Sequence, residues 1–160
     1  MKSPKRPIEP AILNAHISYV RECLRRLQYV EAPNLAEWRV LSDVVNMSET
    51  FMQHNGGVWK RAEYKGATIE LSDDDGVIAE GVKALALVGA RHLEAGEGLR
   101  ICEKGAAALS ELIECYEEIL EVLPESEVEK CKNITTQRVR EILRGKTKPG
   151  DVVVKTVLKG

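Results

Sequence analysis

The stretch from residue 76 to residue 96 constrains the fold of this chain more than any other. Its charged residues are Glu80, Lys83, Arg91 and Glu94, which share one narrow strip if the stretch is helical. A helix that is apolar over most of its circumference needs other elements to cover it in water. We therefore predict that this helix is the centre of a bundle, where its small residues let neighbouring helices approach closely. Those small residues are Gly81, Ala84, Ala86, Gly89 and Ala90.

Four further segments have apolar residues at alternating spacings of three and four, which is typical of amphipathic helices. Pro33 and Pro124 separate these segments, and Asn34 and Ser126 each precede a glutamate by three residues, as in a capping box. We predict helices from Pro10 to the break at Glu31, from Asn34 to about His54, from Ala106 to Leu123 and from Ser126 to about Arg144.

Two segments have the composition of strands. Residues 58–71 are rich in β-branched and aromatic residues, and Tyr64-Lys65-Gly66-Ala67 suits a turn, so we expect a short hairpin there. Residues 151–158 would add a third strand, because an isolated hairpin is marginally stable. The expected fold is mainly α, an α+β arrangement of about five helices with a small accessory sheet. It forms a single domain over 1–160, with a flexible basic arm at 1–8 and a C-terminal tail at 146–160.

Composition narrows the classes of protein that this chain can belong to. No apolar run approaches the roughly 20 residues that cross a membrane, and no apolar segment follows the basic N-terminus as it would in a signal peptide. We expect a cytoplasmic protein with no membrane partner. The formal net charge of −2 gives no overall attraction to nucleic acid. The four cysteines are widely separated, and we expect buried thiols rather than disulfides.

No motif for catalysis, metal binding or cofactor binding is evident. The histidines His16, His54 and His92 lie on three predicted helices without a second ligand at helical spacing. Cys102 could lie beside a helix N-terminus, but it has no partner base nearby in the sequence. The glycines of residues 96–105 lack the register of a phosphate-binding loop. We predict no catalytic residues, no metal site and no cofactor, and lean against an enzyme.

Charge is polarised in the C-terminal half of the chain. Residues 111–129 contain eight glutamates and no basic residue, whereas residues 130–148 contain seven basic residues against Glu141 alone. An acidic helix face is a candidate surface for a basic partner, which could be the last helix of the same molecule. The candidate partner-binding residues on this face are Glu114, Glu117, Glu118 and Glu121.

The basic segment allows two interpretations. In a helix-turn-helix, Asn133-Ile134 would form the turn and a recognition helix would follow. A single continuous amphipathic helix accounts for the apolar spacing without exceptions, and we favour it. The nucleic-acid-binding residues of the first interpretation are Arg138, Arg140, Arg144, Lys146 and Lys148.

The segment LAEWRVLSDVVNMSE contains Trp38, Leu41, Asp43 and Asn46, and an Ala-rich predicted helix that ends in Ala90-Arg91-His92 follows it. In these residues the chain resembles small uncharacterised helical proteins from phages and mobile elements of proteobacteria. The resemblance covers roughly residues 13–145. It implies an accessory role, such as modulation or inhibition of a host protein, including a host-defence protein. It transfers no site residues.

Three functions remain open from the sequence. The leading expectation is a non-enzymatic protein that binds another macromolecule, with a protein as the partner, and the wide apolar stripes are also compatible with a homodimer. The first alternative is a nucleic-acid-binding regulator that uses the basic segment 130–148. The second is a small enzyme, which would need a pocket where a histidine or Cys102 meets another titratable group.

Overall fold

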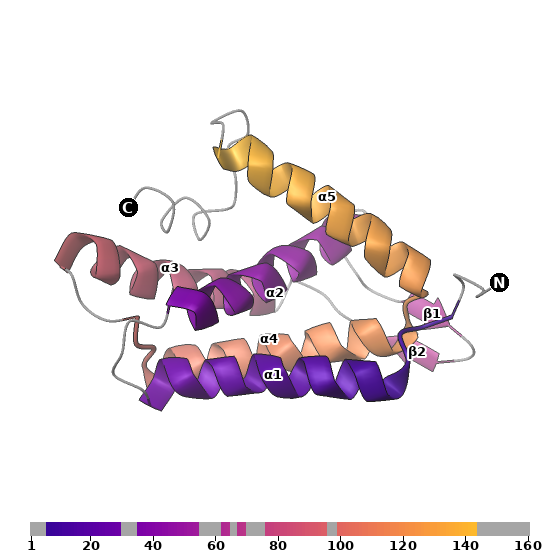
Figure 1. The fold of residues 1–160 in the computed structure, drawn as a ribbon, viewed down its shortest axis with the longest axis horizontal. Coiled ribbons are helices and arrows are strands. Elements are labelled where there is room, and N and C mark those ends of the chain that lie inside the picture. Colours follow the sequence, from indigo (N-terminus) through magenta and orange to yellow (C-terminus); the bar gives the residue numbers. More distant parts are fainter. Residues whose placement is uncertain are drawn as a thin grey trace.

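In the residues that it describes, the computed structural model contains five helices and two short strands (Figure 1). It describes residues 6–29, 35–54, 62–64, 67–69, 76–95 and 99–143. The prediction of a mainly helical bundle with five helices is confirmed. In chain order the elements are α1 (Pro10–Tyr29), α2 (Leu35–His54), β1 (Ala62–Tyr64), β2 (Ala67–Ile69), α3 (Val77–Ala95), α4 (Glu103–Val122) and α5 (Glu125–Leu143).

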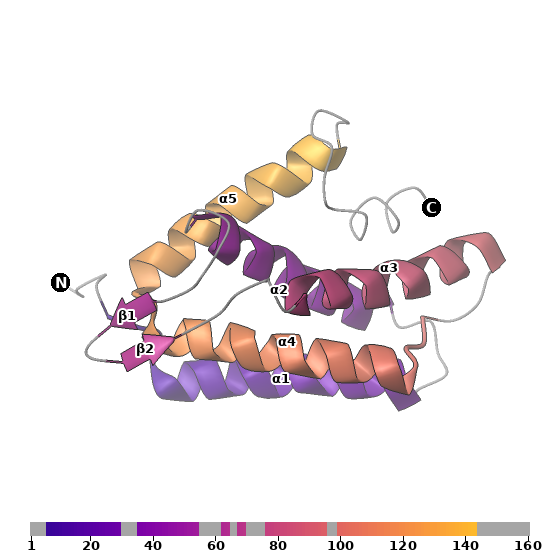
Figure 2. The same cartoon turned by 180° about the vertical axis from the view of Figure 1, so that it is seen from behind.

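Helix α4 is the hub of the bundle. It packs against α1, α2, α3 and both strands, and it runs side by side with α1 in both views (Figures 1 and 2). The prediction that residues 76–96 form the central helix is wrong, because α3 packs mainly against α2 and α4 and leaves Leu87 50% exposed. The apolar circumference of α3 indicates that other elements pack against it, but it does not make α3 the central helix. More side chains are buried on α4 than on α3 among the described residues.

The core that α4 organises is aliphatic. Fully buried leucines and isoleucines from α1, α2, α3 and α4 meet there, and Trp38 of α2 is 1% exposed. The Trp38 indole N–H donates a hydrogen bond to the carbonyl of Leu85 in α3 at 3.1 Å. This bond satisfies the one polar group of a buried tryptophan, as buried indoles usually require. The largest core leucines and isoleucines are Leu27, Leu41, Leu85, Leu99, Leu109, Leu112, Ile113, Ile119 and Leu120.

The close approach predicted for the small residues occurs between α3 and α4. A Cβ atom on Gly81 would lie 2.7 Å from Cδ1 of Leu112, and one on Gly105 would lie 2.8 Å from Cγ1 of Ile101. The same position on Gly105 lies 3.4 Å from Cβ of Ala84. A methyl group at Gly81 would require the Leu112 side chain to move, so glycine at this position favours the close packing of α3 against α4. The nearest atoms at Gly105 belong to Ile101, which precedes α4.

The two strands pair antiparallel, with Ala62 opposite Ile69 and Tyr64 opposite Ala67. They are three residues long each and contact α4. The other residues of the expected hairpin over 58–71 and the expected third strand at 151–158 lie outside the described residues. The three-stranded accessory sheet therefore stays a prediction.

The segment before α1 crosses the junction between α4 and α5. The carbonyl of Arg6 accepts a hydrogen bond from the backbone N–H of Glu125 at 2.7 Å, and Pro7 forms an antiparallel bridge with Pro124. Residues 6–8 are the end of the arm expected to be flexible, and the remainder of that arm lies outside the described residues. This contact holds Ile8 beneath the start of α5.

Helix α5 begins earlier than its expected capping box. The carbonyl of Pro124 accepts from the backbone N–H groups of Glu127 and Val128, so Ser126 already lies inside the helix. Proline is tolerated at this position because no hydrogen bond from its own nitrogen is needed. Among the helices described, none combines the length and the apolar character needed to cross a bilayer.

Candidate functional site

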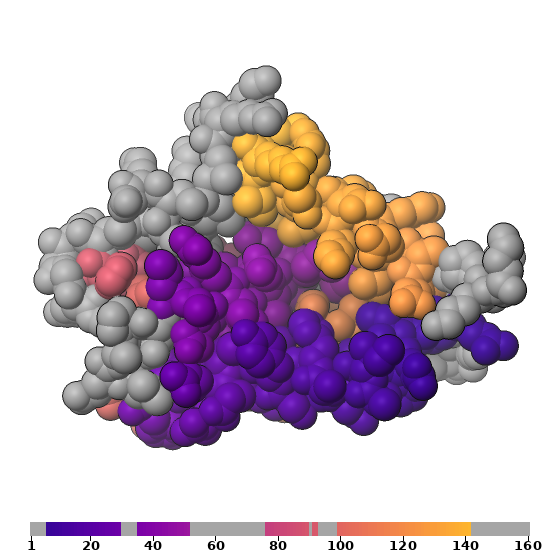
Figure 3. All heavy atoms as spheres, viewed as in Figure 1, coloured from indigo at the N-terminus to yellow at the C-terminus, as the bar shows by residue number. Residues whose placement is uncertain are grey.

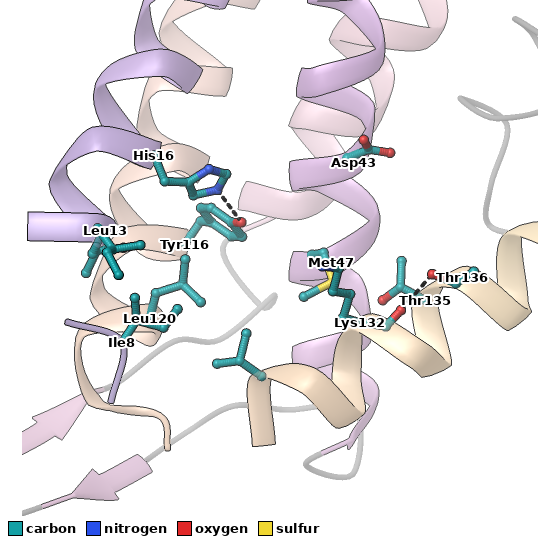
Figure 4. Close-up of a pocket in the computed structure, with 12 residues that line it drawn as sticks. Ile8, Leu13, His16, Asp43, Met47, Tyr116, Leu120, Lys132, Thr135 and Thr136 are labelled. Atoms are coloured by element: carbon teal, nitrogen blue, oxygen red, sulfur yellow. Dashed lines mark hydrogen bonds between the residues drawn. The ribbon is translucent and has the colours of Figure 1, made fainter. Parts of the chain in front are cut away.

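A groove opens where α5 diverges from the rest of the bundle. It has a volume of about 470 Å³ and lies between α1, α2, α4 and α5 (Figures 3 and 4). This volume is within the usual range for ligand pockets in proteins. We call it the α5 groove; its lining residues are Ile8, Ile12, Leu13, His16, Asp43, Met47, Tyr116, Leu120, Val128, Lys132, Thr135 and Thr136.

The walls of the α5 groove are mostly aliphatic. Leu13 and Leu120 are buried in its wall, and Met47 of α2 and Val128 of α5 are half-buried. Ile12 also lines the groove, and this large apolar side chain is 59% exposed. Exposed apolar side chains beside an apolar hollow are typical of interaction sites.

The polar end of the α5 groove is a histidine–tyrosine pair. Nε2 of His16 on α1 lies 2.9 Å from the hydroxyl of Tyr116 on α4, within hydrogen-bonding distance (Figure 4). Tyr116 is 6% exposed, and its ring also packs near that of Phe51, with ring centroids 6.3 Å apart. The pair satisfies two polar groups that would otherwise face an apolar wall.

Burial shifts the pKa of each member of this pair in the direction that favours its neutral form. Partial desolvation lowers the pKa of His16 below its ordinary value of 6.5. Burial, and next the negative charge of Asp43, raise the pKa of Tyr116 to about 12. Both shifts have the sign expected when water is withdrawn from a group that must become charged.

Asp43 and Lys132 add one negative and one positive side chain to the lining of the α5 groove. Asp43 belongs to α2, and its pKa is raised by desolvation against the opposing effect of Arg39. Lys132 belongs to α5 and is exposed. Thr135 is already engaged, since its hydroxyl lies 2.6 Å from that of Thr50 and 2.7 Å from the carbonyl of Cys131. The groove therefore combines aliphatic walls with a neutral polar end and a charged rim.

Part of the expected partner-binding acidic face lies outside the groove. Glu114, Glu118 and Glu121 are exposed on α4, whereas Tyr116 and Leu120 of the same helix line the groove. Glu117 lies 3.8 Å from Arg21 of α1. Helix α5 packs mainly against α2 rather than against this acidic face.

The basic segment is helical without interruption from Glu125 to Leu143, so the helix-turn-helix interpretation is wrong and the continuous helix is confirmed. Arg138 faces α2: its side chain is 12% exposed, lies 3.5 Å from Glu49 and donates to the carbonyl of Asn46 at 2.9 Å. Arg140 is exposed. The other expected nucleic-acid-binding residues, Arg144, Lys146 and Lys148, lie outside the described residues.

Cys102, the possible metal ligands and the residues of the phage-protein resemblance can also be located in the structure. Cys102 caps the N-terminus of α4, where its sulfur accepts from the N–H of Gly105 at 3.4 Å. In the part of the chain that the structure describes, no three His, Cys, Asp or Glu side chains gather as a metal site would require. Among the residues of the phage-protein resemblance, Trp38 and Leu41 are in the core, whereas Asp43 is at the groove.

Sequence reasoning missed the groove and its polar pair. His16 and Tyr116 are 100 residues apart in the sequence, so no local pattern connects them. The available signal was the position of His16 next to Ile17 of the apolar stripe. A comparison of the chain with protein-family models, curated proteins and solved structures finds no match.

Proposed function

We propose that this is a non-enzymatic binding protein that holds an apolar segment of another protein in the α5 groove. The observation that carries the proposal is the combination of aliphatic walls with polar groups that already have partners inside the protein. His16 pairs with Tyr116, and Thr135 pairs with Thr50 and a backbone carbonyl. Such a site gains free energy chiefly by removing apolar surface of an occupant from water.

An amphipathic helix suits the shape and the charges of the groove. The groove follows the space between α5 and the α1–α4 pair (Figure 3). Ile12 lines it and is 59% exposed. A docked helix would place its apolar residues at spacings of three and four against Met47 and Val128, as in other helix-in-groove complexes. Asp43 of α2 and Lys132 of α5 would then select the orientation of a helix with matching charges.

The resemblance to proteins of phages and mobile elements suggests the kind of partner. Proteins resembling those of phages and mobile elements are expected to act on proteins of their host. We infer a partner that is a host protein, including the components of host defence, whose activity is modulated or inhibited by occupation of the groove. The proposal involves no cofactor and no covalent step.

Paired substitutions of exposed residues test the proposal without endangering the core. Ile12→Glu places a charge at the groove, whereas Tyr29→Glu places one on another part of α1, where Tyr29 is 63% exposed. Wild type and both variants would be used to capture partners from a proteobacterial lysate treated with nuclease. We expect one protein to be retained by wild type and Tyr29→Glu and reduced about tenfold or more with Ile12→Glu, because a buried isoleucine contributes about 1.5–3 kcal/mol. Equal recovery by the two variants contradicts the proposal.

A further inference from the structure

A second hollow lies on the other side of the hub helix, between α3 and the N-terminal half of α4. Its volume is about 340 Å³, and its walls include Leu87, Val88, Ile101 and Ala108. Two of its lining residues, Ala84 and Gly105, are small, and a Cβ atom on Gly105 would lie 3.4 Å from Cβ of Ala84. Val88 and Ile101 are 4% and 3% exposed, so the base belongs to the core, whereas Leu87 at the rim is 50% exposed.

The rim of this hollow is cationic although the protein as a whole is acidic. Lys83, Arg91 and Lys104 line it, and Glu80 is the one carboxylate among the lining residues. The Glu80 carboxylate lies 3.4 Å from Nζ of Lys83. Arg91 and Lys104 are exposed, and neither forms an ion pair with a described residue. Two cations therefore flank the aliphatic slot, and neither is paired with a carboxylate of the described residues.

We propose that the slot between α3 and α4 binds an anionic aliphatic molecule, namely a free medium-chain carboxylate. The alkyl chain would lie along Leu87, Val88 and Ala108, and the carboxylate would meet Arg91 or Lys104. The charge of the rim selects an anion over a cation, because exposed cations attract carboxylates and repel ammonium groups. The narrow base between two closely packed helices selects a linear chain over a bulky ring. This proposal is independent of the function proposed for the α5 groove.

Three probes with the same chain separate the effect of charge from that of apolar burial. Dodecanoate, 1-dodecanol and dodecyltrimethylammonium would each be titrated, below the concentration at which they aggregate, into the full-length protein in a calorimeter. We expect one dodecanoate per chain, weaker binding of the alcohol and the weakest binding of the ammonium compound. Decanoate should bind more weakly than dodecanoate, since each fully buried methylene contributes about a fourfold change. Binding of the ammonium compound as tight as that of dodecanoate overturns the proposal, and so does an absence of dodecanoate binding.

A matched pair of alanines locates the binding. Ala108 lines the slot and Ala107 beside it is exposed, so Ala108→Phe fills the slot and Ala107→Phe does not. Ala108→Phe should weaken dodecanoate binding at least tenfold and Ala107→Phe should leave it within twofold. If both variants bind like wild type, dodecanoate is held elsewhere and the assignment to this slot is wrong.

Cys102 supplies an independent readout at the mouth of the slot. It is exposed and lines the slot, whereas Cys115 further along α4 does not line it. Bound dodecanoate should slow the reaction of Cys102 with a maleimide reagent at least threefold without slowing that of Cys115. Replacing both cations, with Arg91→Glu and Lys104→Glu together, should weaken binding roughly three- to tenfold, as expected for exposed ion pairs. The protection of Cys102 should then require roughly three- to tenfold more dodecanoate. Unchanged labelling of Cys102 in saturating dodecanoate contradicts the proposal.

Discussion

The hydroxyl of Tyr116 lies 2.9 Å from Nε2 of His16, and this contact joins α4 to α1 at the polar end of the α5 groove. Tyr116 is almost fully buried, whereas the histidine ring is partly in contact with water. The bond therefore does two things. It satisfies a phenol that could not otherwise be buried there at low cost, and it fixes the imidazole beside the groove wall.

Removal of the Tyr116 hydroxyl should lower stability. Tyr116→Phe leaves Nε2 of His16 without its partner, which costs about 1–3 kcal/mol when the remaining group is buried and less where water can reach it. Urea unfolding should show a lower midpoint with an unchanged dependence on urea concentration. Tyr29→Phe, at an exposed tyrosine of α1, should leave the midpoint unaltered. Equal midpoints for the two variants would show that the His16–Tyr116 bond contributes nothing to stability.

Tyr116 should also govern stability at high pH. Its pKa is about 12 in the folded protein, compared with 10.0 for a free tyrosine, so the folded state retains a proton that the unfolded state loses. The contribution is complete below pH 10 and is lost as the pH rises toward 12, with a total on the order of 2–3 kcal/mol. Because lysines titrate in the same range, the relevant quantity is the difference in unfolding free energy between wild type and Tyr116→Phe. That difference should fall between pH 10 and pH 12; a constant difference contradicts the shift.

His16 should make the protein less stable as the solution is acidified. Burial lowers its pKa below 6.5 in the folded state, so the unfolded chain binds the proton more readily. Stability from this group is complete above pH 6.5 and declines as the pH falls through the lower, folded-state pKa. His16→Gln removes this dependence. The pKa of Asp43 is raised in the folded state, so at more acidic pH this group increases the stability of the protein as the pH falls. Titration of the histidine ring signals by NMR checks the direction, and a His16 pKa above 6.5 would contradict it.

Arg138 and Arg140 should differ in their contribution to folding. Arg138→Ala removes a hydrogen bond to the Asn46 carbonyl and a partly buried ion pair with Glu49, and we expect a loss of about 1–3 kcal/mol. Arg140 is exposed, and Arg140→Ala should change stability by no more than about 0.5 kcal/mol. Thermal unfolding of both variants measures the difference. If both variants lose little stability and both lose nucleic-acid binding equally, the result would favour the alternative function, a nucleic-acid-binding regulator that uses the basic segment 130–148.

The spacing of α3 and α4 should not tolerate a methyl group at Gly81. Alanine has the better helix propensity by about 1 kcal/mol, but its Cβ would lie 2.7 Å from Cδ1 of Leu112. Overpacking of a well-filled core costs about 1–3 kcal/mol, so we expect a net loss near 1 kcal/mol for Gly81→Ala. Combination with Leu112→Val should recover part of that loss relative to the sum of the single changes. If the changes in unfolding free energy of the two single variants simply add in the double variant, the Leu112 side chain is not what excludes a methyl group at Gly81.

The helices could be predicted from the sequence because their information is local. Periodic apolar residues place all five, and Pro33 and Pro124 mark two of their boundaries. Which helix is the hub could not be predicted in the same way. The apolar circumference of residues 76–96 can be read from the sequence. The sequence of α4 shows an acidic face and an apolar face, but it does not show how many other elements pack against the apolar face.

The groove could not be predicted because it depends on the angle at which α5 leaves the bundle. That angle is set by contacts across long stretches of sequence, including Thr135 with Thr50 and Arg138 with the Asn46 carbonyl. The apolar residues that line the groove look like ordinary core positions in the sequence. Only the packing of α5 against α2 instead of α4 leaves them facing an open space.

The central claim is that the α5 groove receives an apolar segment of a protein partner, and site-specific photo-cross-linking tests it most directly. A benzophenone amino acid would replace Ile12 at the groove and, in a separate variant, Ile134, which is 44% exposed on α5 but is not among the groove-lining residues. Cross-linking in proteobacterial cells that produce each variant should give one defined protein adduct from position 12 and none from position 134. An additional Val128→Glu change in the position-12 variant should abolish the adduct. Identical adducts from both positions, or an adduct at position 12 that survives Val128→Glu, would contradict the account.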